Sequence, residues 1–300
     1  MVNFTTIVAI TESALVIFMN IALFPNEMKN HSLKIAEDVC HFLKERNVKV
    51  FAEEGIASSI EALPLKESDY ATIDFRISLG GDGTILRLVH RHPGLQSPLL
   101  GINLGSLGFL ADIPLDDIFP SLQELLDGRF TVQKRMMMEG KGENGNSCFA
   151  VNEVVVHRAQ NSCLIELAIY VDGKYVNAFS ADGIIISTPS GSTAYSLSAG
   201  GPIVTPEFDA FIITPICPHT ISNRPIVLLP RQGIQIKYMS PHLPVEVAYD
   251  GISSFSLATG DSFTVHKSER KFQLVNLARH DYFFTLREKL GWHGKLYQKR

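Results

Sequence analysis

The sequence predicts an N-terminal Rossmann-like α/β domain followed by a C-terminal, antiparallel β-sandwich-like domain. Up to residue 128, short apolar runs typical of strands alternate with longer runs whose apolar residues recur at helical spacing. After about residue 130 the helical spacing stops, and short alternating runs lead into turns such as Asp172-Gly173 and Asp250-Gly251. The first pattern is typical of a mostly parallel sheet covered by helices, and the second of antiparallel strands.

The first domain is predicted to contain four strands that alternate with helices. We expect these strands over residues 21–26, 48–51, 73–79 and 99–103. Ser32 is expected to cap the first helix, whose apolar stripe begins at Leu33, and further helices are expected over 84–90 and 116–128. Because apolar and polar residues alternate from Ile73 to Leu79, this strand is predicted to be half-buried.

The pattern divides the chain into four parts. We expect an extension at 1–19, the α/β domain at 20–128, the β-rich domain at 129–272, and a tail at 273–300 that returns to the first domain. Apolar residues are frequent from Phe4 to Phe24, but Glu12 and Asn20 interrupt them and no lysine or arginine precedes them. A signal peptide or membrane span is therefore the weaker interpretation, and translation starting at Met19 is an alternative.

The composition is that of a globular protein with small-molecule rather than nucleic-acid partners. Of 300 residues, 45% are hydrophobic and 19% are charged, and the net charge of −4 provides no basic field for DNA or RNA. The four cysteines, Cys40, Cys148, Cys163 and Cys217, form no CxxC pair and no metal-spaced cluster with histidine. We therefore expect reduced thiols, a cytoplasmic location and no membrane association.

The segment Gly80-Gly-Asp-Gly-Thr84 lies between a predicted strand and a predicted helix. Glycines in such a turn can adopt positive φ and bring backbone amides close to a phosphate, and the helix N-terminus favours the same anion. Asp82 repels phosphate, so its presence suggests magnesium coordination or a hydrogen bond to an acceptor hydroxyl. The structural alternative is a tight turn in which Asp82 is the helix N-cap.

Two familiar nucleotide-binding motifs are missing from the junctions between predicted strands and helices. The sequence contains no GxxxxGK[ST], and no GxGxxG connects a predicted strand to a predicted helix. A P-loop lysine is therefore missing, and ATP phosphates would have to rest on backbone amides and magnesium. The predicted phosphate-binding residues are Gly80, Gly81, Gly83 and Thr84.

Two further segments place polar residues inside apolar surroundings. Asn152-Glu153 interrupts the apolar run 151–156, where unpaired polar groups would be costly. The pair can bind a ribose or base, or simply neighbouring backbone. The stretch 182–202 leads a buried strand into a loop rich in hydroxyls and glycine, with a helix expected near Thr193, and this density of small polar residues favours a ligand site.

Taken together, these segments resemble the NAD kinase family. The GGDGT turn, the Asn-Glu pair, the 182–202 stretch and the segment 218–225 occur in the order and spacing of that family. The resemblance covers roughly residues 21–296. The sequence departs from the family pattern in its N-terminal extension and at Cys163 and Ser180. The resemblance implies transfer of phosphate from ATP to the adenosine ribose 2′-hydroxyl of NAD, with a divalent metal, magnesium, and a homo-oligomeric (dimeric or tetrameric) enzyme.

The resemblance also implies roles for individual residues. Asp82 would be the catalytic residue that engages the 2′-hydroxyl, and an Asp82→Asn variant would fold normally but lose most activity. The residues that would bind NAD are Asp82, Gly83, Arg87, Asn152, Glu153, Asp182, Thr193, Ala194, Tyr195, Ser196, Leu197, Ser198 and Asp250. In relatives, the aspartate at the position of Asp182 can reach the site of a neighbouring subunit. The sequence does not identify the metal ligands.

Two other functions are compatible with parts of the pattern. A lipid or sugar kinase shares the GGDGT turn, but it would not need the Asn152-Glu153 pair. A non-catalytic NAD-sensing module would keep the 193–198 loop, but it would have no use for Asp82 beside a phosphate-binding turn. Formation of NADP from NAD and ATP distinguishes all three functions.

Overall fold

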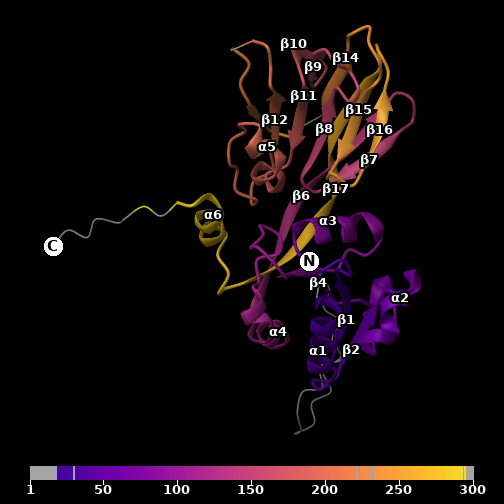
Figure 1. Cartoon of the computed structure of the whole chain (residues 1–300), viewed down its shortest axis with the longest axis vertical. Coiled ribbons are helices and arrows are strands. Elements are labelled where there is room, and N and C mark those ends of the chain that lie inside the picture. The colour runs from indigo at the N-terminus through magenta and orange to yellow at the C-terminus, as the bar shows by residue number, and fades with distance from the viewer. Residues whose placement is uncertain (1–18, 30, 221, 231–232, 293, 295–300) are drawn as a thin grey trace, which may run out of the picture.

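The computed structural model describes residues 19–29, 31–220, 222–230, 233–292 and 294. Figure 1 shows two parts stacked along the long axis of the molecule, an α/β part at the N-terminal end and a β-sandwich above it. Two long strands, β6 (Phe130–Gly142) and β17 (Ser262–Leu277), run from one part into the other. The predicted extension lies outside the described residues except for Met19, which begins the first strand.

The α/β part contains a parallel sheet in the strand order β3-β2-β1-β4-β5. This is the order of a Rossmann-like fold, as the sequence predicts. Its strands are β1 (Met19–Pro25), β2 (Val48–Ala52), β3 (Leu63–Pro64), β4 (Phe75–Gly80) and β5 (Leu99–Asn103). Its helices are α1 (Ser32–Lys44), α2 (Glu54–Ala57), η1 (Ser58–Ile60), η2 (Glu67–Thr72), α3 (Asp82–Arg91), η3 (Leu115–Asp117) and α4 (Ile118–Leu126).

Helices cover both faces of this sheet. One core cluster joins α1 and α4 to Ile77 and Leu79 of β4, and a second joins α3 to Ala22 and Phe24 of β1. Every residue of β4 is therefore buried, including Arg76 and Ser78. The prediction of a half-buried strand was wrong, because a central parallel strand loses both of its faces to helices.

The start of α1 also differs from the prediction. The helix begins at Ser32, and its N-cap is His31 in the left-handed conformation, with φ of 64°. The Ser32 hydroxyl is buried without a hydrogen-bond partner, and Leu33 is exposed. Sequence spacing alone could not show which residue would turn the chain into the helix.

The second part is a sandwich of antiparallel strands, as predicted. One sheet has the order β13-β12-β11-β8-β15-β16, and the other continues through β10-β9-β14-β17, with β6 paired to β17 and β7 paired to β6. The remaining strands are β7 (Ser147–Ala150), β8 (Glu153–His157), β9 (Ile165–Val171), β10 (Lys174–Ala181), β11 (Gly183–Ser187), β12 (Phe211–Ile216), β13 (Ile226–Leu228), β14 (Ile234–Tyr238), β15 (Val245–Tyr249) and β16 (Ser253–Leu257). Two short helical turns, η4 (Ser190–Thr193) and α5 (Tyr195–Ser198), follow β11.

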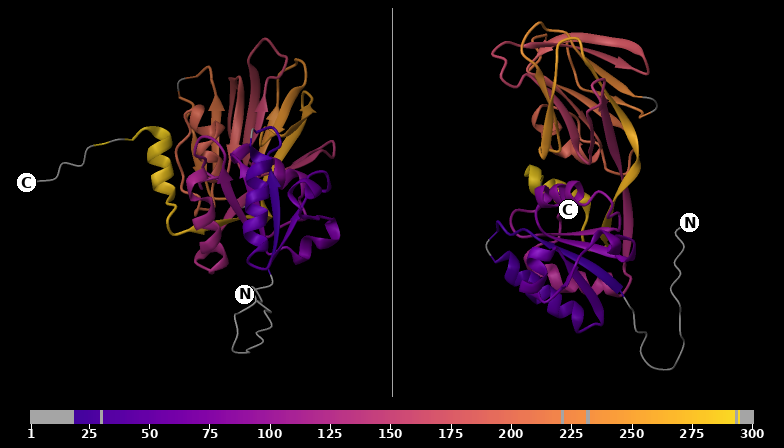
Figure 2. Two further views of the ribbon diagram at one scale, coloured as in Figure 1. Left: turned by 60° about the horizontal axis from the view of Figure 1, so that its bottom comes forward. Right: turned by 90° about the vertical axis from the view of Figure 1, so that its right-hand side faces the viewer.

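The sandwich and the α/β sheet share one continuous backbone ladder. Leu274 of β17 pairs with Leu99 of β5, so the parallel sheet and one sandwich sheet form a single 11-stranded sheet. Figure 2 shows the long strands at one side of the junction between the two parts. This ladder positions the end of α3 against the sandwich.

The C-terminal segment contacts the α/β part. His280 contacts Asp117 at 2.9 Å, and the Lys289 ammonium donates to the Leu107 carbonyl at 2.7 Å from helix α6 (Tyr282–Leu290). Figure 1 shows α6 beside the junction between the two parts. None of the described helices is long and apolar enough to cross a membrane.

The fold predicts a specific cost for adding a methyl group at Gly101 of β5. A Cβ atom there would lie 2.4 Å from the Leu110 carbonyl oxygen and 2.8 Å from the Ala111 Cα, so backbone would have to move. We expect Gly101→Ala to lower the free energy of unfolding by about 1–3 kcal/mol, measured by denaturant unfolding. Gly55→Ala in α2 is the control, because nothing lies within 4 Å of its added methyl group. Equal stability of the two variants would contradict the close packing described here.

Candidate active site

The carboxyl ends of β1, β4 and β5 meet at one edge of the parallel sheet. Asn26 follows β1, Gly80 ends β4 and Asn103 ends β5. The side-chain amide of Asn26 donates to the Thr84 hydroxyl at 3.0 Å, and the backbone amide of Leu104 donates to the Gly80 carbonyl at 2.8 Å. Ligands of doubly wound α/β proteins bind outside this edge, so the GGDGT turn lies where a nucleotide is expected.

Gly80 is required for space rather than for an unusual backbone angle, whereas an added Cβ on Gly81 or Gly83 would meet only ordinary contacts. A Cβ atom on Gly80 would lie 2.3 Å from the Thr84 hydroxyl oxygen, and Gly81 is extended at φ −161°. Gly80, Gly81 and Gly83 all have negative φ, so the expectation of left-handed glycines was wrong. The Thr84 amide donates to the Gly81 carbonyl at 2.9 Å, but the amides of Asp82 and Gly83 precede the first helical hydrogen bond, which keeps this end suited to phosphate.

Asp82 points toward the neighbouring loop. Its carboxylate accepts hydrogen bonds from three consecutive backbone amides, those of Phe109 at 2.8 Å, Leu110 at 3.0 Å and Ala111 at 2.9 Å. The N-cap of α3 is Gly81, so the alternative in which Asp82 caps the helix is wrong. Of about four acceptor positions on a carboxylate, three are used, and one remains open on Oδ2.

The loop that holds Asp82 needs glycine at position 108. A Cβ atom on Gly108 would lie 2.1 Å from Asp82 Oδ1. Asn103 shapes the same loop, because its side chain accepts from the Gly105 amide at 2.6 Å and donates to the Ala111 carbonyl at 3.2 Å. The position of the Asp82 carboxylate is therefore fixed by its own place at the start of α3 and by the backbone of residues 109–111.

Two basic side chains flank the turn. The Lys29 ammonium donates to the Gly80 carbonyl at 3.3 Å and lies 3.0 Å from the place of a Cβ on Gly105. Arg87 is exposed, and its guanidinium donates to the Thr84 hydroxyl at 3.3 Å. The sequence analysis found Arg87 and missed Lys29, although its place just after a strand of the parallel sheet was a signal that could have found it.

Asn152-Glu153 lies on a segment whose backbone is held by Asp250. This carboxylate accepts from the amides of Val151 at 2.8 Å, Asn152 at 2.8 Å and Glu153 at 3.2 Å. The turn after β11 packs on the same segment, where the Thr188 amide donates to the Asn152 carbonyl at 2.8 Å. The Asp250 side chain is completely buried, so the structure places it behind the Asn-Glu pair.

The side chains of the Asn-Glu pair have unfilled hydrogen-bonding capacity. Asn152 Oδ1 and Glu153 Oε2 are buried without partners, as is the hydroxyl of Ser187, which pairs with Glu153 across β11 and β8. Burial, together with the charge of Asp250, raises the pKa of Glu153 to about 8. Since native proteins leave few buried polar groups unpaired, this cluster is suited to a polar ligand.

His90 connects the two halves of the site. It lies near the end of α3, and its Nε2 is 2.8 Å from Asp250 Oδ2. Its ring stacks on Phe149 with a centroid distance of 4.4 Å and an interplanar angle of 10°. Helix α3 therefore begins at Asp82 and ends against the carboxylate that holds Asn152-Glu153. The sequence analysis did not identify His90, because its partner is 160 residues away.

The 193–198 loop presents some of its predicted residues outward and others inward. Tyr195 and Ser198 are exposed, and Thr193, Ala194 and Leu197 are half-buried. Ser196 is buried, and its hydroxyl is 2.8 Å from that of Thr214. The predicted helix near Thr193 consists of two short turns, η4 and α5.

Asp182 lies apart from the other predicted site residues. It precedes β11, whereas Ser187, beside Glu153, ends that strand, which places them roughly 16–17 Å apart along it. Its carboxylate pairs with the Arg158 guanidinium at 2.9 Å. Within one chain, the structure does not bring Asp182 to the GGDGT turn.

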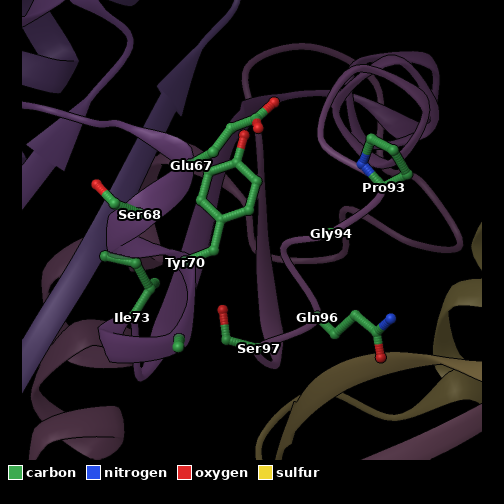
Figure 3. A pocket seen from close by; sticks show the side chains of 9 residues that line it. Glu67, Ser68, Tyr70, Ile73, Pro93, Gly94, Gln96 and Ser97 are labelled. Atoms are coloured by element: carbon green, nitrogen blue, oxygen red, sulfur yellow. The ribbon is translucent and has the colours of Figure 1, made fainter.

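Two pockets differ in their relation to this site. A pocket of about 400 Å³ is lined by Phe109, Asp112, Arg135 and Tyr282, and so borders the loop that holds Asp82. Burial raises the pKa of Asp112 in its wall. A second pocket, of about 690 Å³, lies between η2 and the loop after α3, away from the turn (Figure 3). Within the described ranges, no three His, Cys, Asp or Glu side chains are arranged to hold a metal ion.

Family models and curated sequences agree on what the chain resembles. Residues 17–130 match the ATP-NAD kinase N-terminal domain, and residues 151–277 match the ATP-NAD kinase C-terminal domain. The chain is 67% identical over 276 residues to the NAD kinase of Protochlamydia amoebophila, covering 92% of this chain and 99% of that protein. It is 39% identical over 278 residues to the NAD kinase of Geotalea daltonii, covering 91% and 98%.

Solved structures show the same similarity. Yeast NADH kinase complexed with NADH superposes with a TM-score of 0.81 at 28% identity, covering 94% of this chain and 90% of that chain. An NAD kinase from Archaeoglobus fulgidus in complex with ATP superposes with a TM-score of 0.73 at 28% identity, covering 92% and 100%. Both matches span the α/β part and the sandwich.

The raised pKa of Glu153 predicts a pH-dependent effect of its replacement. Between pH 4.5 and about 8 the folded state keeps a proton that the unfolded state releases, so this residue makes stability fall as pH rises. Glu153→Gln cannot ionise, so its stability lacks this fall. The free energy of unfolding of the variant, relative to that of the wild type, should therefore increase by on the order of a few kcal/mol as the pH rises from about 5 to about 9. Urea unfolding at several pH values measures this difference. The exposed Glu143→Gln is the control, and parallel pH profiles for Glu153→Gln and wild type would refute the buried neutral carboxyl.

Proposed function

The chain belongs to the NAD kinase family and transfers phosphate from ATP to the adenosine ribose 2′-hydroxyl of NAD, and we propose that the Asp82 carboxylate binds that hydroxyl. The observation that supports this role is the geometry of its carboxylate. Three backbone amides hold it at the turn, and one acceptor position on Oδ2 remains for a further donor. A ribose hydroxyl is such a donor, and its proton passes to the carboxylate as the phosphoryl group is transferred.

We propose that ATP phosphates lie at the start of α3. The turn residues Gly80, Gly81, Gly83 and Thr84 offer backbone amides and a hydroxyl, and Lys29 and Arg87 add positive charge on either side. Phosphoryl transfer depends on positioning and charge neutralisation more than on covalent chemistry, and this arrangement supplies both. Lys29 takes the role that the lysine of a P-loop has in other nucleotide-binding proteins.

We propose that magnesium accompanies ATP. Mg²⁺ binds nucleotide phosphates and water with only one or two protein carboxylates, so it does not need a protein-only cage. The ion would supply charge neutralisation on the phosphates, and the turn residues 80–84 contain one carboxylate, that of Asp82.

We propose that NAD is held by the second half of the site. The unpaired oxygens of Asn152 and Glu153 would accept hydrogen bonds from NAD, and Gly83 and Arg87 of α3 would add further contacts to it. Residues 193–198 form the loop nearby, with Tyr195 available for stacking on a base. Asp250 would act through the backbone of the Asn-Glu pair, and Asp182 would contribute to the site of a neighbouring subunit.

We also propose a cytoplasmic homo-oligomer, a dimer or tetramer, with the domain limits 20–128, 129–272 and a tail at 273–300. The edge strands β10 and β13 expose apolar side chains that suit contacts between copies, among them Tyr175, Val176, Ile226 and Val227. All four cysteines are free, which fits a reducing compartment.

Activity is tested directly with purified protein, ATP, magnesium and NAD. NADP formation, measured by chromatography, is the expected result. A lipid or sugar kinase, or a protein that only senses NAD, would produce none.

Replacement of Asp82 should affect both chemistry and the loop. In Asp82→Asn, one carboxylate oxygen is replaced by an NH₂ group, which cannot accept the hydrogen bond from the facing backbone amide. We therefore expect a lower melting temperature, whereas the sequence alone predicts normal folding. We expect kcat to fall by about 10²–10⁴ when NADP formation is measured well below that temperature. The exposed Asp38→Asn on α1 is the control. More than about a tenth of wild-type kcat in Asp82→Asn would exclude it as the proton acceptor.

Lys29 should matter for ATP and not for the fold. We expect Lys29→Met to lower kcat/KM for ATP by about 10–100-fold, because a charge-assisted contact to phosphate is lost. The KM for NAD should change much less. Lys34→Met, an exposed residue of α1, should leave both constants unchanged. An unchanged kcat/KM for ATP in Lys29→Met would place the phosphates elsewhere.

A further inference from the structure

Arg76 is a buried cation whose charge the surrounding protein does not balance. It lies in the middle of β4 with 3% of its surface exposed. Its Nε donates to the Ser97 carbonyl at 2.8 Å. Among the residues that the structure describes, no carboxylate lies within 4.0 Å of its guanidinium. Burial lowers the pKa of Arg76 to about 10, which leaves it protonated at neutral pH.

The guanidinium lines a small cavity whose ionisable side chains are all basic. The cavity has a volume of about 20 Å³ and is lined by Arg76, His92, Arg270 and Lys271, by the neutral Gln96, and by apolar side chains such as Met137 and Phe272. No aspartate or glutamate is among its lining residues. A volume of this size holds one water molecule or one monatomic ion.

The other three basic residues already have acidic partners outside the cavity. Arg270 pairs with Glu139 at 3.4 Å, Lys271 with Asp209 at 3.2 Å, and His92 with Glu53 at 2.8 Å. Arg76 is therefore the one cation of this cavity left without a counter-charge in the described structure. Buried charges in proteins are normally paired, because an isolated one costs several kcal/mol even after relaxation.

We propose that this cavity binds a chloride ion, which provides the counter-charge of Arg76. A monatomic anion matches the volume of about 20 Å³. The negative end of the α3 dipole opposes an anion here, and the basic residues His90 and Arg91 in the last turn of that helix offset it.

The chloride site is distinct from both the substrate site and the larger neighbouring pocket. Val89 lines the cavity and Asp82 begins the same helix, so the two sites are about 10 Å apart along α3. The 690 Å³ pocket of Figure 3 shares Pro93 and Gln96 with the cavity, but it contains the carboxylate of Glu67. Its Tyr70 hydroxyl is already bound to His92 at 2.6 Å. The anion would therefore stabilise the junction between α3, β4 and β17 rather than contact a substrate.

The test compares melting temperatures in chloride and in gluconate at equal ionic strength, using the full chain. Gluconate is too large for the cavity, so chloride at ten times its dissociation constant should raise the melting temperature by about 3 °C. Arg76→Met should show no difference between the two salts. Arg129→Met, which removes an exposed arginine, should keep the wild-type response to chloride. An equal wild-type melting temperature in both salts, or a chloride effect that persists in Arg76→Met, would overturn the proposal.

A crystal of the wild-type protein soaked in bromide provides an independent test that does not depend on a variant's folding. Bromide replaces chloride and scatters anomalously, so a peak between Arg76 and Lys271 is expected. A water molecule at that position, with no anomalous signal, would show that the guanidinium is hydrated instead and would refute the chloride site.

Discussion

Two aspartates, each bound by three consecutive backbone amides, determine the geometry of the active site. Asp82 accepts from residues 109–111, and Asp250 accepts from residues 151–153. Helix α3 joins these interactions, because it begins at Asp82 and its His90 contacts Asp250. The acceptor carboxylate and the Asn152-Glu153 pair are therefore fixed relative to each other by one short helix. Displacement of either loop would change the distance between the proposed phosphate and NAD sites.

Much of the fold could be predicted because local patterns carry it. The alternation of strand and helix signals indicates the parallel sheet, and Asp-Gly turns at 172–173 and 250–251 mark antiparallel hairpins, where both residues of each pair have positive φ. The GGDGT turn could be placed at the carboxyl edge of the sheet for the same reason. The full burial of β4 could not be predicted, because it depends on helices that cover both faces.

The part of the site that sequence could not predict depends on contacts between distant residues. Asp250 binds amides 97 to 99 residues earlier in the chain, and its complete burial follows from strand pairing that spacing does not reveal. Resemblance predicts Asp250 as a site residue, and the structure places its side chain behind the Asn-Glu pair. The position of Lys29 just after β1 was a signal in the sequence, but its proximity to Gly80 depends on the pairing of β1 with β4.

The geometry of Asp82 also indicates what kind of catalysis the site can perform. A carboxylate free in solvent could rotate, but three amides give this one a single orientation and leave one acceptor position. In a loose phosphoryl-transfer transition state the attacking hydroxyl keeps its proton until late, so orientation of that hydroxyl contributes more than strong basicity. Gly108 is required because any side chain there would collide with the carboxylate. In the proposed mechanism, the same loop therefore determines both where the hydroxyl binds and how its oxygen faces the phosphate.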